Sequence, residues 1–223
     1  MKMRKVLITG ASRGIGAATA EIFRTHGYEV SAPSHQELDL ADEESIERFI
    51  RLHQDVTYDI IINNAGINDI NEIENITDRE IEDMIAINLI APIKLIRGFV
   101  GNMKRAQYGR IVNIGSIWGV VSKEGRCVYS ATKNGIHGVT NTLAVELAKY
   151  NILVNTVCPG FTLTELTKKN NTEEEIKRIS DEIPVGRMAD PKEIAQVIYF
   201  LCSEENTYLT GQKITVDGGY AER

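Results

Sequence analysis

A tyrosine and a lysine four positions apart, Tyr129 and Lys133, have the spacing in this sequence that points most directly to chemistry. Because the residues around them have the pattern of a helix, the two side chains are expected on one face of it. A cation beside a phenol favours the ionised form and lowers a pKa that is normally about 10. The phenol of Tyr129 could then exchange a proton with a substrate oxygen, as general acid–base catalysis requires.

A serine follows a β-branched run and is expected to share the same cleft. Ser116 comes just after the run at 110–114, where a predicted strand ends. Ligands of parallel α/β sheets bind beyond the carboxyl ends of the strands, so the Ser116 hydroxyl can reach a substrate carbonyl there and polarise it.

A glycine-rich turn, TGASRGIG at 9–16, lies between a predicted strand and a predicted helix. Gly10 allows a tight turn, Gly14 lets the backbone approach a pyrophosphate, and Gly16 lets the helix pack closely on the strand. The helix N-terminus offers free N–H groups to the phosphate charge. The spacing G-x-x-x-G-x-G differs from the commoner G-x-G-x-x-G, but its context predicts a dinucleotide site.

The elements that must position these residues alternate between short β-branched runs and longer helical stretches. Strands are predicted at 5–9, 29–32, 59–63, 110–114, 153–157 and 213–216, and helices at 14–25, 42–53, 78–105, 128–150 and 191–202. This alternation predicts an α/β fold: a single doubly wound Rossmann-type domain over 1–223, with a parallel sheet of six to seven strands and helices on both faces. The charged, amphipathic stretch at 164–183 is interpreted as a mobile substrate lid.

Composition narrows the classes of function. The chain has 223 residues, 43% hydrophobic and 25% charged, with a net charge of −6. A negative chain without a basic stripe indicates neither a nucleic-acid nor a membrane partner. The apolar run after the basic start is too short for a signal peptide or a membrane span, so a cytoplasmic location is expected. Three scattered cysteines and four scattered histidines predict neither a disulfide framework nor a metal site.

Together, these motifs resemble those of the short-chain dehydrogenase/reductase family, in the same order and over nearly the whole chain. The motifs are the glycine turn at 9–16, NNAG at 63–66, Asn88, Ser116, Tyr129 with Lys133, Pro159-Gly160 and DGG at 217–219. The resemblance implies that the glycine turn holds the pyrophosphate. It also implies that NNAG supports the adenosine side and that Pro159-Gly160 lies against the nicotinamide.

The resemblance further implies a mechanism. Tyr129 gives a proton to the carbonyl oxygen as hydride arrives, Ser116 holds that oxygen, and Lys133 binds the nicotinamide ribose. Asn88 positions a water that links Lys133 to solvent. Thr162 and Thr164 align with the segment that contacts the carboxamide, with Thr164 favoured. The implied cofactor contacts are Gly10, Ser12, Arg13, Gly14, Ile15, Gly16, Ser34, Asp39, Leu40, Asn64, Ala65, Gly66, Tyr129, Lys133, Pro159, Gly160, Thr162 and Thr164.

The sequence favours NADP(H) over NAD(H). Ser34 aligns with the position where an acidic side chain would bind the ribose hydroxyls and repel a 2′-phosphate. Arg13 supplies a cation that accompanies a 2′-phosphate in many family members, although NAD-using relatives also carry arginine there. Asp39-Leu40 resembles the pair that contacts adenine. The family helix that normally lies between the second and third strands is expected to be largely missing, so that 34–38 turns back directly.

The branch of the family that the chain most resembles is the bacterial 3-oxoacyl-acyl-carrier-protein reductases, notably at 109–116 and 184–187. This implies reduction of a 3-oxoacyl thioester or a small ketone. However, Gln107 and Tyr150 stand where that branch often has basic residues for the acidic carrier, and only Lys104, Arg105 and Lys149 lie nearby. Trp118 is expected either to narrow the pocket or to pack in the core.

Two other functions stay open. The same residues could oxidise a sugar or another secondary alcohol, or the protein could be a nicotinamide-binding redox sensor without turnover. The resemblance also implies a homotetramer, assembled through the long helices that carry Asn88 and Tyr129.

Overall fold

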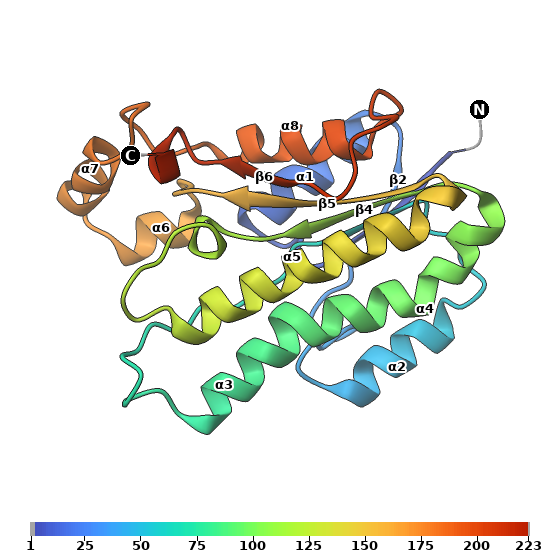
Figure 1. Ribbon diagram of the computed structural model, residues 1–223, viewed down its shortest axis with the longest axis horizontal. Coiled ribbons are helices and arrows are strands. Elements are labelled where there is room, and N and C mark those ends of the chain that lie inside the picture. Colours follow the sequence, from blue (N-terminus) through green and yellow to red (C-terminus); the bar gives the residue numbers. More distant parts are fainter. Residues whose placement is uncertain (1–2, 223) are drawn as a thin grey trace.

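A six-stranded parallel sheet forms the centre of the protein, as seen in the computed structural model, which describes residues 3–222 (Figure 1). The strand order is β2-β1-β3-β4-β5-β6, with every neighbouring pair parallel. The predicted doubly wound sheet is confirmed, at the lower end of the expected strand number. The strands are β1 (Lys5–Ile8), β2 (Glu29–Ser31), β3 (Ile60–Asn63), β4 (Gly109–Ile114), β5 (Ile152–Pro159) and β6 (Lys213–Val216).

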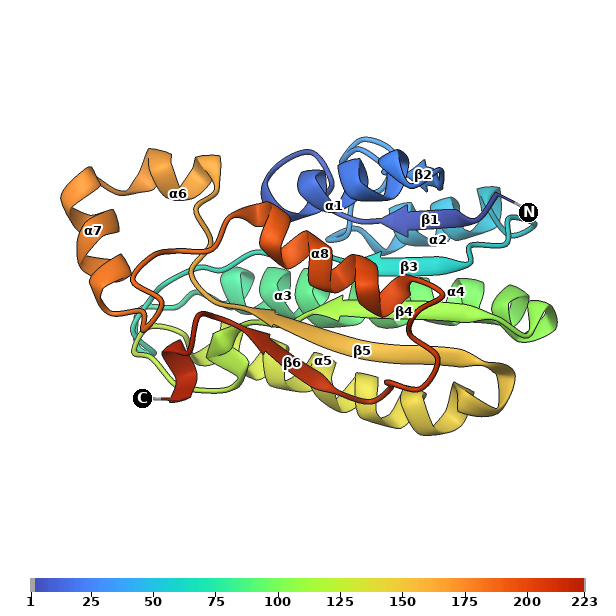
Figure 2. The ribbon, with the colours of Figure 1, turned by 90° about the horizontal axis from the view of Figure 1, so that it is seen from above.

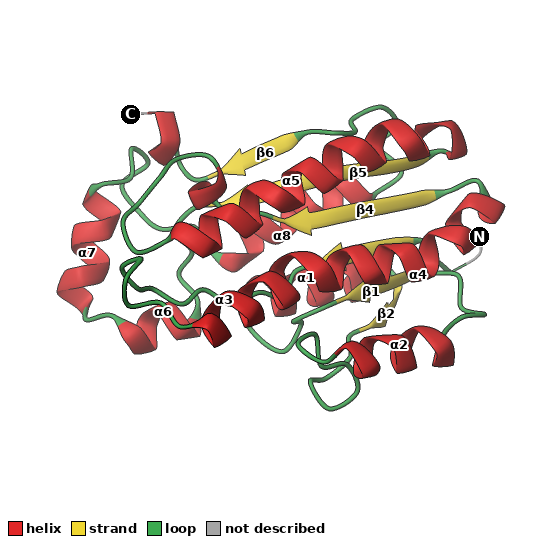
Figure 3. Ribbon diagram, turned by 60° about the horizontal axis from the view of Figure 1, so that its bottom comes forward, coloured by secondary structure: helices red, strands yellow, loops and turns green. Residues whose placement is uncertain are grey.

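Helices cover both faces of the sheet, as predicted (Figure 3). One face packs against α1 (Gly14–Thr25) and α8 (Pro191–Cys202), and the other against α2 (Glu43–Leu52), α4 (Ala91–Ala106) and α5 (Cys127–Leu147). Alternate residues of β1 serve the two cores: Leu7 joins the α2/α4/α5 side, whereas Val6 and Ile8 join the α1/α8 side. All three are fully buried, which explains why this strand reads as an unbroken apolar run.

The helix predicted at 78–105 is interrupted. It consists of α3 (Asp78–Ile85), a π-helical turn η1 (Ala86–Ile90) and α4. A capping box at Thr77 and Glu80 starts it.

The run Asp78–Ala106 is long and apolar enough to cross a membrane by length and composition, but core helices of soluble proteins pass the same test. Leu95 and Phe99 are fully buried in the core beneath α2 and α4.

Two segments near the ends of the sheet were predicted only in outline. Between β2 and α2, Ser34 O accepts hydrogen bonds from the backbone N–H groups of Glu37 (3.1 Å) and Leu38 (2.9 Å), so the chain turns back directly, as expected. The expected loss of the helix between the second and third strands is wrong, because α2 is present there, capped by Asp42 and packed through Ile46 and Phe49. The stretch predicted as a lid contains α6 (Glu165–Asn170) and α7 (Glu173–Asp181). Figure 2 shows that both helices lie beyond the carboxyl ends of β4 and β5.

Candidate active site

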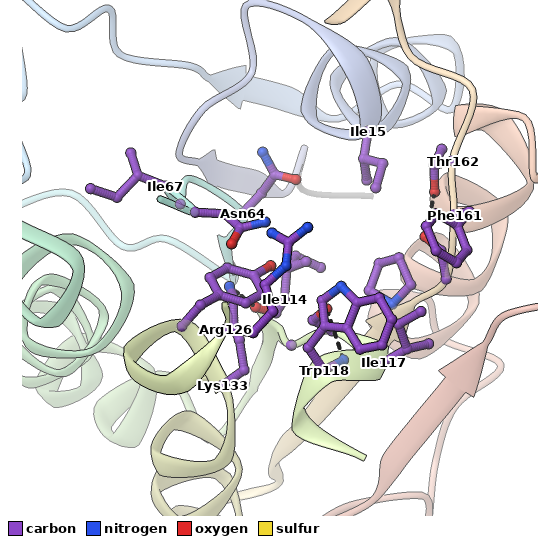
Figure 4. A pocket seen from close by; sticks show the side chains of 17 residues that line it. Ile15, Asn64, Ile67, Ile114, Ile117, Trp118, Arg126, Lys133, Phe161 and Thr162 are labelled. Carbon is purple, nitrogen blue, oxygen red and sulfur yellow. Dashed lines mark hydrogen bonds between the residues drawn. The ribbon is translucent and has the colours of Figure 1, made fainter. Parts of the chain in front are cut away.

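A cavity of about 340 Å³ lies beyond the carboxyl ends of β3, β4 and β5, where a doubly wound sheet places its ligands (Figure 4). Its walls come from the segments after these strands and from the start of α5. The lining residues are Ile15, Asn64, Gly66, Ile67, Asn68, Ile114, Gly115, Ser116, Ile117, Trp118, Arg126, Tyr129, Lys133, Pro159, Gly160, Phe161 and Thr162.

Three of the four predicted catalytic residues line this cavity: Ser116, Tyr129 and Lys133. Ser116 follows β4 and is the N-cap of a short 3-10 helix, η2 (Ile117–Gly119), where its hydroxyl accepts from Trp118 N at 3.1 Å. Tyr129 and Lys133 lie in the first two turns of α5. The fold therefore brings together a hydroxyl, a phenol and an ammonium from two separate elements.

Lys133 is almost completely buried, with 5% of its surface exposed. Its Nζ donates to the carbonyl of Ile114 at 2.8 Å and lies 5.5 Å from the centroid of the Tyr129 ring. Burial lowers the pKa of Lys133 to about 8, because an ammonium is poorly solvated inside the protein. The side chain is thus fixed in place and close to its titration range at neutral pH.

The pKa of the Tyr129 phenol is raised, contrary to the shift expected from the sequence. Burial is the main cause, and hydrogen bonding to Ser116 and the charge of Arg126 oppose it. Desolvation disfavours the phenolate more strongly than the neighbouring charges favour it. The spacing of Tyr129 and Lys133 therefore predicted the wrong direction for the pKa shift of Tyr129, because the extent of burial depends on the tertiary structure.

Asn88, the fourth predicted catalytic residue, lies behind the cavity wall in the π-helical turn η1. Its side chain accepts from Ile67 N at 2.9 Å and donates to Ile67 O at 2.9 Å and to the Thr132 hydroxyl at 3.2 Å. A Cβ built on Gly66 would lie 3.1 Å from Asn88 Oδ1 and 3.4 Å from Lys133 Nζ. Asn88 thus ties the segment after β3 to α5, next to Lys133.

The glycine turn is held against the NNAG segment. Asn64 Nδ2 donates to the carbonyls of Thr9 and Gly10, both at 3.0 Å, and the Thr9 hydroxyl accepts from the N–H groups of Asn64 and Ala65, both at 3.1 Å. Gly16 has no room for a side chain, because a Cβ there would lie 2.2 Å from Gly10 O. The first strand, the first helix and the segment after β3 therefore meet at this turn.

The residues at this turn fit a dinucleotide phosphate. Gly10 and Gly14 have φ values of 65° and 56°, which favour glycine. Helix α1 begins without a capping side chain and has no acidic residue in its first turn, whereas α2, α3, α7 and α8 are each capped by a side chain. The first N–H groups of α1 thus remain available to an anion.

The segment after β5 closes the other side of the cavity. Pro159, Gly160 and Thr162 line it, and the Thr162 hydroxyl donates to Gly160 O at 3.2 Å. Thr164 caps α6 by accepting from Thr167 N at 3.1 Å. It also approaches the glycine turn, since a Cβ on Gly14 would lie 3.2 Å from its Cγ2.

Among the predicted cofactor contacts, Asn64 and Gly66 of the NNAG segment line this cavity, whereas Ser12, Arg13, Ser34, Asp39 and Leu40 do not. Ser12 and Arg13 are exposed on the glycine turn, and Leu40 packs against the core. Asp39 is engaged locally, because its carboxylate accepts from Ala41 N at 2.9 Å. Ser34 donates from its N–H and its hydroxyl to Glu37, at 2.8 and 2.9 Å. The sequence analysis found no acidic residue at position 34 and did not consider Glu37, whose carboxylate the turn at 34–38 places beside Ser34.

Arg126 and Phe161 are among the cavity side chains that the sequence analysis did not predict. Arg126 stands three residues before Tyr129, a spacing that could have signalled a shared helix face. Phe161 packs edge-on against Trp118, with ring centroids 5.9 Å apart, and Tyr220 packs against both rings. Trp118 is 7% exposed and lines the cavity, so it both packs in an aromatic cluster and narrows the pocket.

No metal site is found within residues 3–222, where no group of three or more His, Cys, Asp or Glu side chains could hold an ion. The polar side chains that line the cavity carry hydroxyl, phenol, amide, ammonium and guanidinium groups.

Comparisons with known proteins agree with this geometry. A family model described as enoyl-(acyl carrier protein) reductase matches residues 31–221. The 3-oxoacyl-(acyl-carrier-protein) reductase FabG of Vibrio cholerae serotype O1 is 35% identical over 233 residues, covering 96% of this chain and 95% of that relative.

Solved structures are similar over the whole fold. The structure of 4-hydroxyisoleucine dehydrogenase complexed with NADH has a TM-score of 0.93 and 28% identity, and the match covers 99% of each chain. ElxO with NADP bound has a TM-score of 0.92 and 29% identity, covering 99% of this chain and all of that one.

Proposed function

The chain belongs to the short-chain dehydrogenase/reductase family, whose members are oxidoreductases that use NAD(P), and we propose that it reduces a small carbonyl compound with Tyr129 as general acid. The observation that carries the proposal is the convergence of Ser116, Tyr129 and Lys133 in one cavity beyond the carboxyl ends of the strands. The nicotinamide, when bound, supplies the hydride.

The residues of this chain divide the remaining work. Ser116 holds the substrate oxygen, and Tyr129 gives it a proton. The raised pKa of Tyr129 keeps the phenol protonated at neutral pH, which suits a general acid in the reductive direction. Lys133 and the segment at Pro159–Thr162 hold the nicotinamide and its ribose, and Asn88 ties Ile67 to Thr132, the residue before Lys133.

The proposed cofactor preference is NADP(H) over NAD(H), carried by Arg13. Glu37 opposes it, because the hydrogen bonds from Ser34 hold the pKa of this carboxyl below its usual value and keep it ionised. Glu37→Gln would remove the negative charge while retaining a hydrogen-bond acceptor for Ser34. We expect this change to raise the ratio of NADPH to NADH affinity by a few-fold, measured by fluorescence titration. An unchanged ratio would mean that the Glu37 charge plays no part in cofactor choice.

The proposed substrate is a small ketone or a 3-oxoacyl thioester, without a firm carrier-protein dock. Tyr150, at one of the two positions compared with the carrier-binding branch, is flanked by Lys104 and Lys149, whose Nζ atoms lie 5.3 and 5.2 Å from its ring centroid. Lys104 also pairs with Glu146 at 3.4 Å, which partly neutralises it. The pairing of Lys104 with Glu146 weakens this site as a dock for an acidic carrier, whereas Lys149 retains a cation there.

The whole chain is proposed to act as one dinucleotide-binding and catalytic domain in the cytoplasm, with 164–183 closing over the substrate. The segment lies beyond the carboxyl ends of the strands, the edge at which the cavity opens (Figure 2). None of the described side chains of α7 is buried, so this helix can move without breaking the core.

A homotetramer is the proposed assembly. An apolar groove between α4 and α5 includes Ile93, Val100 and Leu143, and Val145 beside it on α5 is 84% exposed. Covering such a surface with a second copy removes apolar area from water. A monomeric mass by light scattering at micromolar concentration would reject this assembly.

The experiment that tests the function begins with NADPH and NADH binding. Oxidation of the bound cofactor is then followed with acetoacetyl thioesters, simple ketones and keto sugars, for the wild type and for Tyr129→Phe. The substitution removes only the phenolic oxygen, so we expect turnover to fall by about 10²- to 10⁴-fold, the usual size of a general-acid contribution. Cofactor affinity should change little.

Other outcomes would replace the proposal. Turnover only of secondary alcohols with oxidised cofactor would assign a dehydrogenase acting in the oxidative direction. Tight cofactor binding without turnover of any carbonyl or alcohol would indicate a non-catalytic nicotinamide-binding protein.

A further inference from the structure

Arg126 brings a cation into the catalytic cavity that the proposed mechanism does not use. It lies at the start of α5, three residues before Tyr129, and it lines the cavity. Figure 4 shows its side chain reaching toward the space between Asn64 and Trp118. Its guanidinium carbon lies 6.0 Å from the Trp118 ring centroid, within the range of a cation–π contact that helps to hold it.

Two hydrogen-bond donors of the Arg126 guanidinium have no acceptor among the described residues. Nε and Nη1 of Arg126 are buried, and neither has a hydrogen-bond partner in the protein. An arginine stays charged, and its donors form a planar fork that matches a carboxylate. Buried donors without partners are costly in a folded protein. Two such donors beside a ligand cavity therefore indicate a ligand group that pairs with them.

The charge of the cavity favours an anion. Among the described residues that line it, Arg126 and Lys133 are cationic and none is acidic. The Lys133 ammonium already donates to Ile114 O and is assigned to the cofactor ribose. The Arg126 guanidinium is the cation left for the substrate.

The size of the cavity favours a small molecule. Its volume of about 340 Å³ is at the lower end of the range of ligand pockets, and a nicotinamide ring must share it. Trp118 and Phe161 form a rigid apolar wall. A short carbon skeleton could lie along this wall with its charged end at Arg126.

We propose that the substrate is a small oxo acid, or the matching hydroxy acid in reverse, whose carboxylate is bound by Arg126 while its carbonyl oxygen lies between Ser116 and Tyr129. This inference rests on the proposed function and narrows its substrate class. In reduction, the carbonyl carbon gains the hydride that the nicotinamide loses, the oxygen gains the Tyr129 proton, and the carboxylate is unchanged. A paired carboxylate would fix the orientation of the carbonyl in the cavity.

The test compares acids with their neutral esters. Values of kcat/KM are measured for short 2-, 3- and 4-oxo acids and for the methyl ester of each, with the wild type, Arg126→Gln and Arg126→Lys. We expect the wild type to prefer an acid. Arg126→Gln should lower kcat/KM for that acid by about 10- to 100-fold, the range for a hydrogen bond to a charged group, and leave the ester nearly unchanged. Arg126→Lys should keep part of the preference, because it retains the charge without the fork.

Two controls separate binding from a structural effect. Arg79→Gln, on the exposed side of α3, makes the same change in net charge and should leave both substrates unaffected. Cofactor affinity, measured by fluorescence, should be the same in Arg126→Gln and the wild type. If it is, the variant is folded and the effect lies in substrate recognition.

The outcomes that overturn the inference differ from those that overturn the function. Equal losses for acid and ester in Arg126→Gln would show that Arg126 acts on Tyr129 and not on a carboxylate. Turnover of neutral ketones but of no oxo acid would reject the anionic substrate and leave the reductase intact. Turnover of no carbonyl or alcohol would reject the proposed function and this inference with it.

Discussion

The cleft wall and the α6–α7 segment lie side by side but are held by different forces. The wall is built on β4, β5 and α5, where Ser116, Lys133 and all eight residues of β5 are buried. In α7 no described side chain is buried, and the helix is defined by a capping box at Thr172 and Glu175. Among the described residues at the end of this segment, Ile183 is buried in the core, and just beyond it Val185 N donates to Gly218 O at 3.2 Å.

The difference separates two requirements of the proposed reaction. Proton transfer needs Ser116 and Tyr129 in fixed positions, which buried packing provides. Substrate entry and product release need a cover that opens at low cost, which a capped but exposed helix provides. Substitutions in the wall should therefore change global stability and chemistry together, whereas substitutions in α7 should change local opening alone.

The largest effect is expected at the glycine turn. In Gly16→Ala, the added Cβ would lie 2.2 Å from Gly10 O and 2.4 Å from Asn64 Nδ2, so the turn must move. We expect the free energy of unfolding to fall by about 1–3 kcal/mol, as in other overpacked sites, and cofactor binding to weaken with it. Urea unfolding and fluorescence titration measure the two effects. Gly101→Ala in α4 is the control, because its Cβ would meet only Arg105 Nη1 at 3.7 Å. An equal loss of unfolding free energy in Gly101→Ala would mean that the effect of Gly16→Ala does not come from crowding at the turn.

An effect of similar size, but on stability alone, is expected at Lys133, and it depends on pH. The folded protein holds this proton only up to a pKa of about 8, whereas the unfolded chain holds it up to the usual 10.5. Between these values the unfolded state binds more protons, so the Lys133 contribution to the free energy of unfolding rises with pH and is smallest below about pH 8. Lys133→Met lacks this slope.

Urea unfolding of wild type and Lys133→Met between pH 7 and pH 10 measures the slope. The stability of the wild type relative to the variant should increase by on the order of 1–3 kcal/mol across the window, since one pKa unit corresponds to about 1.4 kcal/mol. Lys192→Met, at an exposed lysine of α8, is the matched control and should show no such change. If the unfolding free energies of wild type and Lys133→Met changed with pH in the same way, the lowered pKa of Lys133 would be wrong.

The smallest effect is expected in the proposed lid. Thr172→Ala removes a side chain that accepts from Glu175 N at 3.2 Å, at a cost of about 1 kcal/mol for a lost helix cap. Amide hydrogen exchange in α7 should become about fivefold faster, while the global melting temperature stays the same. A drop in global stability equal to the cap energy would mean that α7 unfolds with the core and is not an independent cover.

Most of the fold was predictable because burial imposes regular patterns. The bounds of α1, α8 and β6 match their predictions, because the glycine turn precedes α1, Pro191 opens α8 and a β-branched run marks β6. The interruption at Asn88 was not predicted, because a π-helical turn keeps the apolar pattern of the flanking helices. The length of β5, which reaches Pro159, depends on pairing with β6 and so on distant residues.

The sequence by itself determined the fold class, the glycine turn and the identity of the groups that meet beyond the strands. These are consequences of local spacing and of periodicity. The tertiary structure alone decided how those groups behave. It half-buries Tyr129 and buries Lys133, so that both pKa values shift toward the neutral forms. It also leaves two donors of Arg126 unpaired beside the catalytic cavity, because solvation and pairing depend on neighbours that are distant in the chain.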